Sequence, residues 1–270
     1  MTENDHTTLT VHRGVPFAER DQGSLALDVY EPDRSAPGPA VVLVHGGGFH
    51  FGRPGELSRY ALDLAAAGYV AIDVQYRLAP GHQFPAALLD VKTAIEWART
   101  DGESYGVDGS WIGAVGYSAG ANLVALAAAT AGESGFEPEE YPGVSSALDA
   151  VVGLAGVYDF AAMSDSDPEN DDLHTSYLGV SPNEDRERAE LASPAVQADA
   201  SMPPTLLLHG RDDGTVPPAQ SEQFASVLRP LTDVEFELLD SDHCFPLYGL
   251  EYETVSERLL AFFEAQADPR

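Results

Sequence analysis

Short apolar runs alternate along the chain with longer segments in which apolar residues recur every three or four positions, as at Leu88, Val91 and Ile95. A short run bounded by Gly, Pro or Asp is typical of a buried strand, and the longer spacing is typical of a helix with one buried face. The apolar runs predict strands near residues 9–17, 24–31, 40–45, 69–75, 111–116, 149–155, 204–209 and 234–239. The periodic segments predict helices near residues 57–67, 86–100, 119–130, 218–228 and 252–265.

The order of these elements predicts the architecture of the sheet. From residue 40 onward strands and helices alternate, which is typical of a mostly parallel sheet covered by helices on both faces. The first two strands are joined by a polar turn at residues 19–23 and predict an antiparallel hairpin at one edge. With 270 residues, of which 44% are hydrophobic, the chain is long enough to bury a full core, and we expect a single α/β domain over residues 1–270.

Two segments interrupt this alternation, residues 132–146 and residues 160–200. Both are rich in acidic residues, and connections of this length in a compact domain are usually functional or mobile. The second segment follows the sixth predicted strand, and we expect it to form a small lid-like insertion. Apolar residues in and beside it could either line a substrate pocket or anchor the segment.

The most specific motif is Gly116–Gly120 (GYSAG), which lies between an apolar strand run and a helix run. A G-x-S-x-G sequence in that context is typical of a nucleophile elbow, a tight turn that exposes a serine hydroxyl ahead of a helix. Such a turn needs neighbours without bulk, which Gly116, Gly120 and Ala121 supply. Ser118 is therefore the candidate nucleophile.

A serine hydroxyl near neutral pH needs a base, and the base needs an acid that orients it. Asp213 lies in a turn-rich loop after the seventh predicted strand, and His243 follows the eighth. The order Ser, Asp, His, with each residue after a separate strand, is typical of α/β-hydrolases. Asp213 is the candidate acid and His243 the candidate base, with Asp240 and Asp242 as alternative acids.

The oxyanion that develops on an attacked carbonyl needs hydrogen-bond donors. The sequence HGGGF at residues 45–49 follows the third predicted strand, and its consecutive glycines let backbone N–H groups turn toward a ligand. Gly46 and Gly47 are the candidate donors. Ala119, the residue after the nucleophile, is the third.

Together these segments resemble the α/β-hydrolase carboxylesterases, in particular the hormone-sensitive-lipase-like and feruloyl-esterase-like enzymes with an HGGG oxyanion loop. The resemblance covers about residues 24–264 and rests on HGGGF at 45–49, YRLAP at 76–80, GYSAG at 116–120, HGRDDGTVP at 209–217 and the histidine at 243. It implies an α/β-hydrolase fold with an eight-stranded, mostly parallel sheet and a small lid. It also implies the nucleophile, acid, base and donors that are named above.

Three details refine the resemblance. The spacing from His209 favours Asp213 over Asp212 as the acid. Hormone-sensitive-lipase relatives usually carry Asp where Tyr117 stands, and they have a long N-terminal cap, whereas only 44 residues precede His45. These two departures favour the shorter, cap-poor esterases.

The resemblance therefore implies an enzyme that hydrolyses short-chain carboxylic esters through an acyl-enzyme. The candidate substrate-binding residues are Phe49, Tyr117, Tyr158 and Met163. An arylformamidase, a sugar acetyl esterase and a small exopeptidase are alternatives on the same fold. A non-catalytic binding protein is the alternative from another class, since a fold does not prove chemistry. The complete set of catalytic candidates argues against it.

The charge balance is unusual, because 44 Asp and Glu stand against 14 Lys and Arg, for a formal net charge of −30. Lys92 is the only lysine of the chain. Self-repulsion on this scale opposes compaction at low ionic strength, and molar salt relieves it by shortening the Debye length to about 3 Å. The composition predicts a protein from an extreme halophile. It also excludes nucleic acid as a partner, because no basic patch could neutralise phosphates.

The remaining features predict a cytoplasmic protein without cofactors. Residues 1–11 have neither the positive region nor the apolar core of a secretory signal, and no stretch approaches the roughly 18 apolar residues of a membrane span. The single cysteine, Cys244, allows no internal disulfide. No paired His or Cys spacing typical of metal ligands occurs, so we expect no metal. The expected partner is a small-molecule ester, and the sequence is compatible with a monomer or a homodimer.

Overall fold

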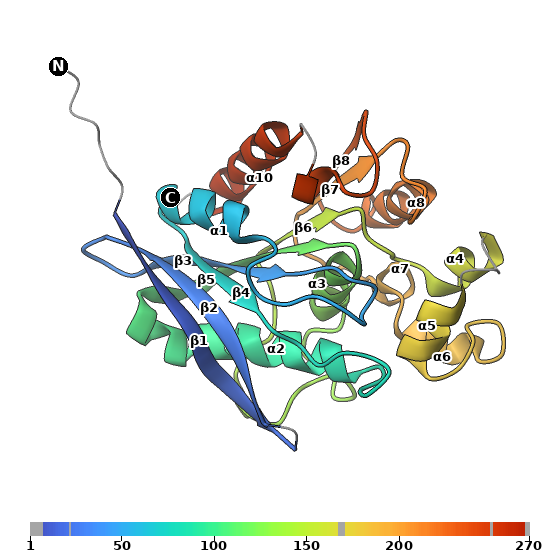
Figure 1. The fold of residues 1–270 in the computed structure, drawn as a ribbon, viewed down its shortest axis with the longest axis horizontal. Helices are drawn as coiled ribbons and strands as arrows, with labels where there is room; N and C mark the ends of the chain where they lie inside the picture. Colours follow the sequence, from blue (N-terminus) through green and yellow to red (C-terminus); the bar gives the residue numbers. More distant parts are fainter. Residues whose placement is uncertain (1–7, 22, 167–170, 249–250, 268–270) are drawn as a thin grey trace.

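A computed structural model describes residues 8–21, 23–166, 171–248 and 251–267 (Figure 1). Its centre is an eight-stranded sheet with the strand order β1-β2-β4-β3-β5-β6-β7-β8. The strands are β1 (Leu9–Arg20), β2 (Gly23–Pro32), β3 (Gly38–Val44), β4 (Val70–Val74), β5 (Val107–Tyr117), β6 (Ala150–Leu154), β7 (Thr205–Gly210) and β8 (Val234–Leu239). Strand β2 pairs antiparallel with β1 and with β4, and every neighbouring pair from β4 to β8 is parallel. The predicted strands, the mostly parallel sheet and the edge hairpin are confirmed.

Five longer helices cover the two faces of the sheet, as predicted. Helices α1 (Ser58–Ala66) and α10 (Tyr252–Ala267) pack on one face, and α2 (Ala86–Arg99), α3 (Ala119–Ala129) and α8 (Ala219–Leu228) pack on the other (Figure 1). The alternation of side chains along β3 sends Val42 into the cluster of α2 and α3 and Leu43 into the cluster of α1 and α10. The central strands are continuously apolar because both of their faces are buried.

The structure also contains elements that the patterns did not predict. Strand β5 begins at Val107, four residues before the predicted start. The prediction missed this start because residues 108–110 interrupt the apolar run, although Val107 pairs with Gly38. The segment 160–200 contains the short helices α4 (Phe160–Ser166), α5 (Asp171–Leu178), α6 (Arg186–Leu191) and α7 (Pro194–Gln197). The 3-10 helix η1 (Asp101–Tyr105) and α9 (Phe245–Tyr248) are short as well. None of these helices is long enough to show an apolar periodicity.

Residues 160–200, called the cap segment below, are tied to the sheet-covering helices by buried side chains. In α3, Asn122 Nδ2 donates to Val157 O at 2.9 Å and to Ala192 O at 3.1 Å. In α8, the Gln220 side-chain oxygen accepts from the backbone N–H of Tyr158 and of Asp159, both at 2.8 Å. The residues that lead into the cap segment, and Ala192 near its end, are therefore fixed to the helices that flank the sheet.

The acidic loop at residues 132–146 is joined to α2 by the only lysine of the chain. Lys92 is fully buried in α2, and its Nζ donates to Thr130 O at 2.6 Å and to Glu137 at 2.7 Å. Glu96, one turn further along α2, is also buried, and burial raises its pKa to about 7, with the nearby Glu137 carboxylate adding to the shift. Among the described residues no helix is both long and apolar enough to cross a membrane.

Candidate active site

Ser118 forms the whole connection between β5, which ends at Tyr117, and α3, which begins at Ala119. Its backbone has φ 53° and ψ −116°, a conformation that residues with a side chain rarely adopt. The two motif glycines are needed for close approach, because a Cβ on Gly116 would collide with Gly120 O and a Cβ on Gly120 would collide with Val44 O. This strained turn leaves Ser118 8% exposed, which is the geometry of a nucleophile elbow.

A chain of hydrogen bonds joins Ser118 to two residues that are distant in sequence. Ser118 Oγ lies 3.1 Å from His243 Nε2, and His243 Nδ1 lies 2.7 Å from Asp213 Oδ2. An ionised carboxylate only accepts, so Nδ1 carries the imidazole proton and Nε2 is left to accept from the serine hydroxyl. The structure therefore brings together the three side chains that were predicted as nucleophile, base and acid.

Asp213 receives hydrogen bonds from its own loop and from a second histidine. Its Oδ1 accepts from the backbone N–H of Thr215 and of Val216, both at 2.8 Å. The fully buried His209 places Nε2 3.0 Å from Oδ2, the oxygen that also faces His243. Burial raises the pKa of Asp213, but the hydrogen bonds from His209, His243 and Val216 outweigh it and hold the pKa well below its usual range. The acid is thus ionised at neutral pH.

The protonation of His209 follows from its neighbours. Nε2 lies 2.9 Å from Val216 O, which can only accept, so Nε2 carries the proton and donates to Val216 and Asp213. Nδ1 lies 2.6 Å from Ser221 Oγ, and the serine hydroxyl donates to it. From its place at the end of a predicted strand, His209 was expected to support the acid loop, and the structure shows that it does so by direct contact with the Asp213 carboxylate.

The other acidic residues that were considered as the acid lie elsewhere. Asp212 is exposed. Asp240 pairs with Arg211 at 3.0 Å, and Asp242 accepts from the backbone N–H of Cys244 at 2.8 Å. Among the described residues, Asp213 is the carboxylate that hydrogen-bonds to His243.

The loop at residues 45–51, called the oxyanion loop below, passes through the left-handed region at three consecutive residues. Gly47 has φ 99°, Gly48 has φ 58° and Phe49 has φ 67°. A Cβ on Gly47 would collide with Phe51 O, so the tight turn requires glycine there. Within the described residues, the N–H groups of Gly46 and Gly47 donate to no protein acceptor. Such amides are available to a ligand.

The remaining predicted donor lies at the start of a helix. Ala119 is the first residue of α3, where a backbone N–H has no acceptor one turn earlier. The base of the oxyanion loop is held by Tyr76, whose hydroxyl donates to His45 O at 3.0 Å and to Gly46 O at 3.1 Å. This support by Tyr76 was not predicted, because its partners lie about 30 residues away in the sequence.

The four predicted substrate-binding residues occupy different surroundings. The Tyr117 hydroxyl donates to His243 O at 3.1 Å, and Phe49 is buried with its ring stacked on Tyr177. Tyr158 is fully buried and stacked on Phe224 of α8, and Met163 is buried in the cap segment. Tyr117 therefore lies beside the candidate base and Phe49 lies in the oxyanion loop, and contact of any of the four with a substrate stays a prediction.

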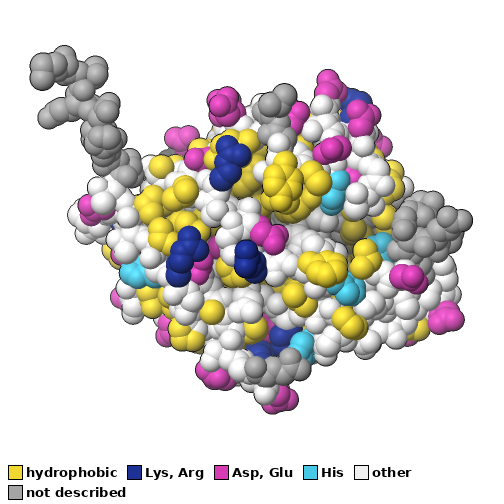
Figure 2. All heavy atoms as spheres, viewed as in Figure 1, with side chains coloured by type: hydrophobic (Ala, Val, Ile, Leu, Met, Phe, Trp, Pro, Cys, Tyr) yellow, Lys and Arg dark blue, Asp and Glu magenta, His cyan; other side chains and the backbone are white. Residues whose placement is uncertain are grey.

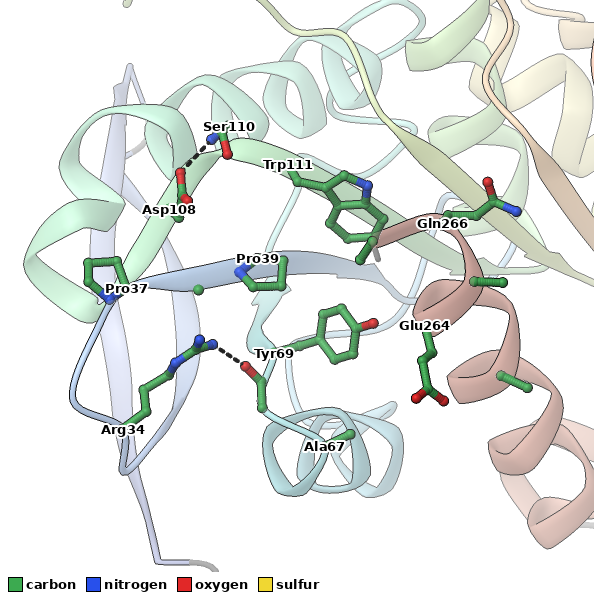
Figure 3. A pocket seen from close by; sticks show the side chains of 15 residues that line it. Arg34, Pro37, Pro39, Ala67, Tyr69, Asp108, Ser110, Trp111, Glu264 and Gln266 are labelled. Carbon is green, nitrogen blue, oxygen red and sulfur yellow. Dashed lines mark hydrogen bonds between the residues drawn. The ribbon is translucent and has the colours of Figure 1, made fainter. Parts of the chain in front are cut away.

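A pocket of about 1130 Å³ lies at the other end of the sheet (Figure 3). It is lined by residues that precede or begin β3 and β5, such as Arg34, Pro39 and Trp111, and by the last turns of α10. Parallel α/β sheets bind ligands at the carboxyl ends of their strands, where Ser118 stands. The described residues contain no group of three or more His, Cys, Asp or Glu that could hold a metal ion.

A family model and similar curated sequences point to the same kind of protein. The BD-FAE family model matches residues 27–228. Esterase LipC of Mycobacterium tuberculosis is 34% identical over 218 residues, which are 78% of this chain and 54% of the relative. The probable carboxylic ester hydrolase LipM of the same organism is 32% identical over 83% of this chain and 54% of the relative. The chain thus spans about half the length of these curated relatives.

Solved structures show the same architecture over nearly the whole chain. A truncated carbohydrate esterase from gut microbiota is 25% identical, with a TM-score of 0.84 and coverage of 98% of both chains. Esterase 2 of Thermogutta terrifontis is 24% identical, with a TM-score of 0.80, and covers 100% of this chain and 98% of its own. The fold is that of the α/β-hydrolase esterases, as predicted.

Proposed function

We propose that this chain, which belongs to the BD-FAE family, is a carboxylesterase that cleaves short-chain esters through an acyl-enzyme. The observation that carries the proposal is the pair of hydrogen bonds from Ser118 through His243 to Asp213, built on a serine with positive φ. A strained serine that meets a neutral imidazole nitrogen is arranged for nucleophilic attack. The names of the relatives LipC and LipM support an ester as the substrate class.

The first half of the reaction forms the acyl-enzyme. Ser118 Oγ attacks the ester carbonyl while His243 Nε2 takes the serine proton, and the ionised Asp213 stabilises the imidazolium and keeps its Nδ1 proton in place. The tetrahedral oxyanion accepts from the N–H groups of Gly46, Gly47 and Ala119. His243 then gives its proton to the departing alcohol oxygen.

The second half regenerates the serine. Water attacks the acyl carbonyl, His243 accepts a proton from that water, and the same backbone donors hold the second oxyanion. His243 returns the proton to Ser118 Oγ as the carboxylic acid leaves. Each proton that His243 accepts is given back within the cycle, so the reaction needs no cofactor.

The short acyl chain is inferred from how the cap segment fills the space beside the oxyanion loop. Phe160 and Tyr177 of the cap segment are fully buried, and both rings lie within 6 Å of the Phe49 ring. These rings occupy space that a long acyl chain beside the loop would need. Two of the exposed large apolar side chains are Phe51, at the end of the oxyanion loop, and Tyr248, five residues after His243. They favour a substrate with an uncharged organic alcohol group over one with a highly charged group.

A sugar acetyl ester is the second candidate substrate. It is favoured by the likeness to the carbohydrate esterase from gut microbiota, which extends over 98% of both chains. An acetyl group also meets the requirement for a short acyl chain. A comparison of acetylated xylose with simple alkyl acetates and butyrates, at equal concentrations, separates the two substrates.

Substitution of Ser118 tests the proposed function directly. Ser118→Ala is expected to reduce the rate of p-nitrophenyl acetate hydrolysis to roughly 10³-fold above the uncatalysed rate, which is what binding and the oxyanion donors alone supply. Ser110→Ala is the matched control, because Ser110 is an exposed serine on the same strand. Labelling by a fluorophosphonate should disappear in the first variant and persist in the second. Wild-type rates in Ser118→Ala would refute the assignment.

We also propose that the acidic surface adapts the protein to high salt. Figure 2 shows Asp and Glu side chains scattered over the visible face, with few Lys and Arg. The only lysine is buried and paired with Glu137, so it does not offset the surface charge. Activity and melting temperature are expected to rise from dilute buffer toward molar potassium chloride, because screening relieves the repulsion. Full activity together with full stability in dilute buffer would contradict this proposal.

A further inference from the structure

The outer half of the oxyanion loop touches α5 of the cap segment at two neighbouring residues. The ring of Phe49 stacks on the ring of Tyr177 with centroids 3.7 Å apart and planes 9° apart. His50 Nε2 lies 2.7 Å from Ser176 Oγ. Loop and helix are more than 120 residues apart in sequence, so each contact is purely tertiary.

The histidine contact has a defined direction. His50 Nδ1 lies 2.7 Å from Gly48 O, which can only accept, so Nδ1 carries the proton. Nε2 then accepts from the Ser176 hydroxyl. The imidazole thus connects the carbonyl of a loop glycine to α5 through one continuous set of hydrogen bonds.

Phe49 has a backbone conformation that is unusual for a residue other than glycine. It has φ 67°, where glycine would be unstrained and a residue with a Cβ is not. A strained residue persists only where its surroundings hold it, and here the stacked ring of Tyr177 and the hydrogen bond from Ala79 N to Phe49 O at 2.9 Å do so. The aromatic side chain therefore holds the loop in a conformation that its backbone would otherwise leave.

Helix α5 is itself fixed to the body of the protein. Tyr177 O accepts from Phe84 N at 2.8 Å, ahead of α2. Arg188 donates to Leu178 O and, at 2.8 Å, to Phe84 O, which joins α5, α6 and the start of α2. A helix that is anchored in this way can support a loop that is strained.

We propose that Ser176 and Tyr177 are positioning residues that hold the oxyanion loop with its amides directed at the reacting carbonyl. The cap segment would then contribute to the chemical step, through the stack on Phe49 and the hydrogen bond to His50, rather than only enclose the substrate. This inference rests on the proposed esterase function, because it concerns the donors that act in that reaction.

The experiment compares three variants of the full chain with wild type. Tyr177→Leu removes the stacked ring, and Ser176→Ala removes one hydroxyl from a half-buried site. Tyr177→Phe is the matched control, because the Tyr177 hydroxyl is buried without a hydrogen-bond partner among the described residues and the ring is kept. The measurements are kcat and KM on p-nitrophenyl acetate, and the affinity for a trifluoromethyl ketone, which forms an oxyanion on the serine.

Misplaced donors should lower kcat and leave KM nearly unchanged, since the oxyanion exists only in the transition state. We expect kcat to fall about 10- to 100-fold in Tyr177→Leu and about 3- to 10-fold in Ser176→Ala, and the ketone affinity to fall by the same factors. Tyr177→Phe should stay within about 2-fold of wild type. If Tyr177→Leu does not fold, Ser176→Ala still carries the test.

Two outcomes would overturn the proposal. One is an unchanged kcat with a raised KM in Ser176→Ala and in Tyr177→Leu where it folds, which would make α5 a substrate contact. The other is an equal loss in Tyr177→Phe and Tyr177→Leu, which would assign the effect to the hydroxyl. A wild-type chain that hydrolyses no ester and is not labelled at Ser118 would instead refute the proposed function itself, and this inference with it.

Discussion

The two ends of the catalytic arrangement are held in opposite ways. At the acid end, the hydrogen-bond partners of Asp213 other than His243 come from its own loop and strand, namely His209, Thr215 and Val216. At the oxyanion end, the loop is supported by residues far away in the sequence, Tyr76 at its base and Ser176 and Tyr177 at its outer half. One end is a local structure and the other depends on tertiary packing.

Because the two ends are held differently, substitutions at each end should affect the reaction differently. Changes near Asp213 alter the charge and orientation of the base, so they should appear in the pH dependence of the reaction. Changes in α5 alter the placement of neutral backbone donors, which do not titrate, so they should lower kcat at every pH. The pH profile of kcat/KM therefore separates the two ends.

The largest effect is expected at the acid end. Asp213→Asn keeps the shape of the side chain but removes the charge that holds the Nδ1 proton of His243, and kcat should fall about 10⁴-fold, as for the same change in serine proteases. Steady-state hydrolysis of p-nitrophenyl acetate measures the loss. Asp212→Asn is the control, since Asp212 is exposed and adjacent. Equal losses in the two variants would show that the local description of the acid end is wrong.

A smaller effect is expected at the same end when His209 is replaced. His209→Leu removes one of the hydrogen bonds that lower the pKa of Asp213, so the carboxylate becomes more basic. The carboxylate then stabilises the protonated form of His243 more strongly. We expect the acidic limb of kcat/KM to move to higher pH and the maximal rate to fall about 10-fold.

At the oxyanion end we expect no such shift of the acidic limb. Tyr177→Leu should lower kcat without moving the acidic limb, because no charged group is altered. His209→Gln should recover part of the profile, since its side-chain amide can donate to Asp213. A shift of the limb in Tyr177→Leu as large as that in His209→Leu would mean that the two ends are not independent.

The smallest effect is expected in a region outside both ends, which serves as a reference. The folded pKa of Glu96 is raised to about 7 by burial, above its usual value, so the folded chain keeps a proton that the unfolded chain releases. Its contribution to the free energy of unfolding therefore falls as pH rises between about 4.5 and 7. In Glu96→Gln the free energy of unfolding should therefore fall by about 1 kcal/mol less than in wild type over this pH range. Urea unfolding at constant salt across that range measures it, and kcat should not change.

Much of the fold was predictable from the chain. Central strands such as β3 and β7 are continuous apolar runs because both of their faces are buried, and α2 shows the spacing of a helix that packs on a sheet. The start of β5 was not predictable, because Val107 pairs with Gly38 but is separated from the apolar run by residues 108–110. The short helices of the cap segment were missed because their formation depends on anchors such as Asn122, not on periodicity.

The candidate site divides in the same way. The glycines around Ser118 are required by close backbone contacts that any such turn makes, so the motif predicted the turn. The order of Ser118, Asp213 and His243 predicted which residues could meet, because the carboxyl ends of parallel strands share one edge of the sheet. The roles of Ser176 and Tyr76 could not be predicted. Ser176 lies in no recognised motif, and the motif YRLAP at 76–80 does not indicate which distant carbonyls Tyr76 contacts.

The set of strands, the elbow at Ser118 and the candidate acid and base could therefore be recognised in the chain alone. They depend on side-chain size, polarity and spacing over a few residues. Two contacts became visible only in the folded chain: His209 and His243 share one oxygen of Asp213, and α5 contacts the oxyanion loop at Phe49 and His50. Contacts between distant segments depend on how whole layers pack, and packing is a property of the folded chain rather than of any short stretch of it.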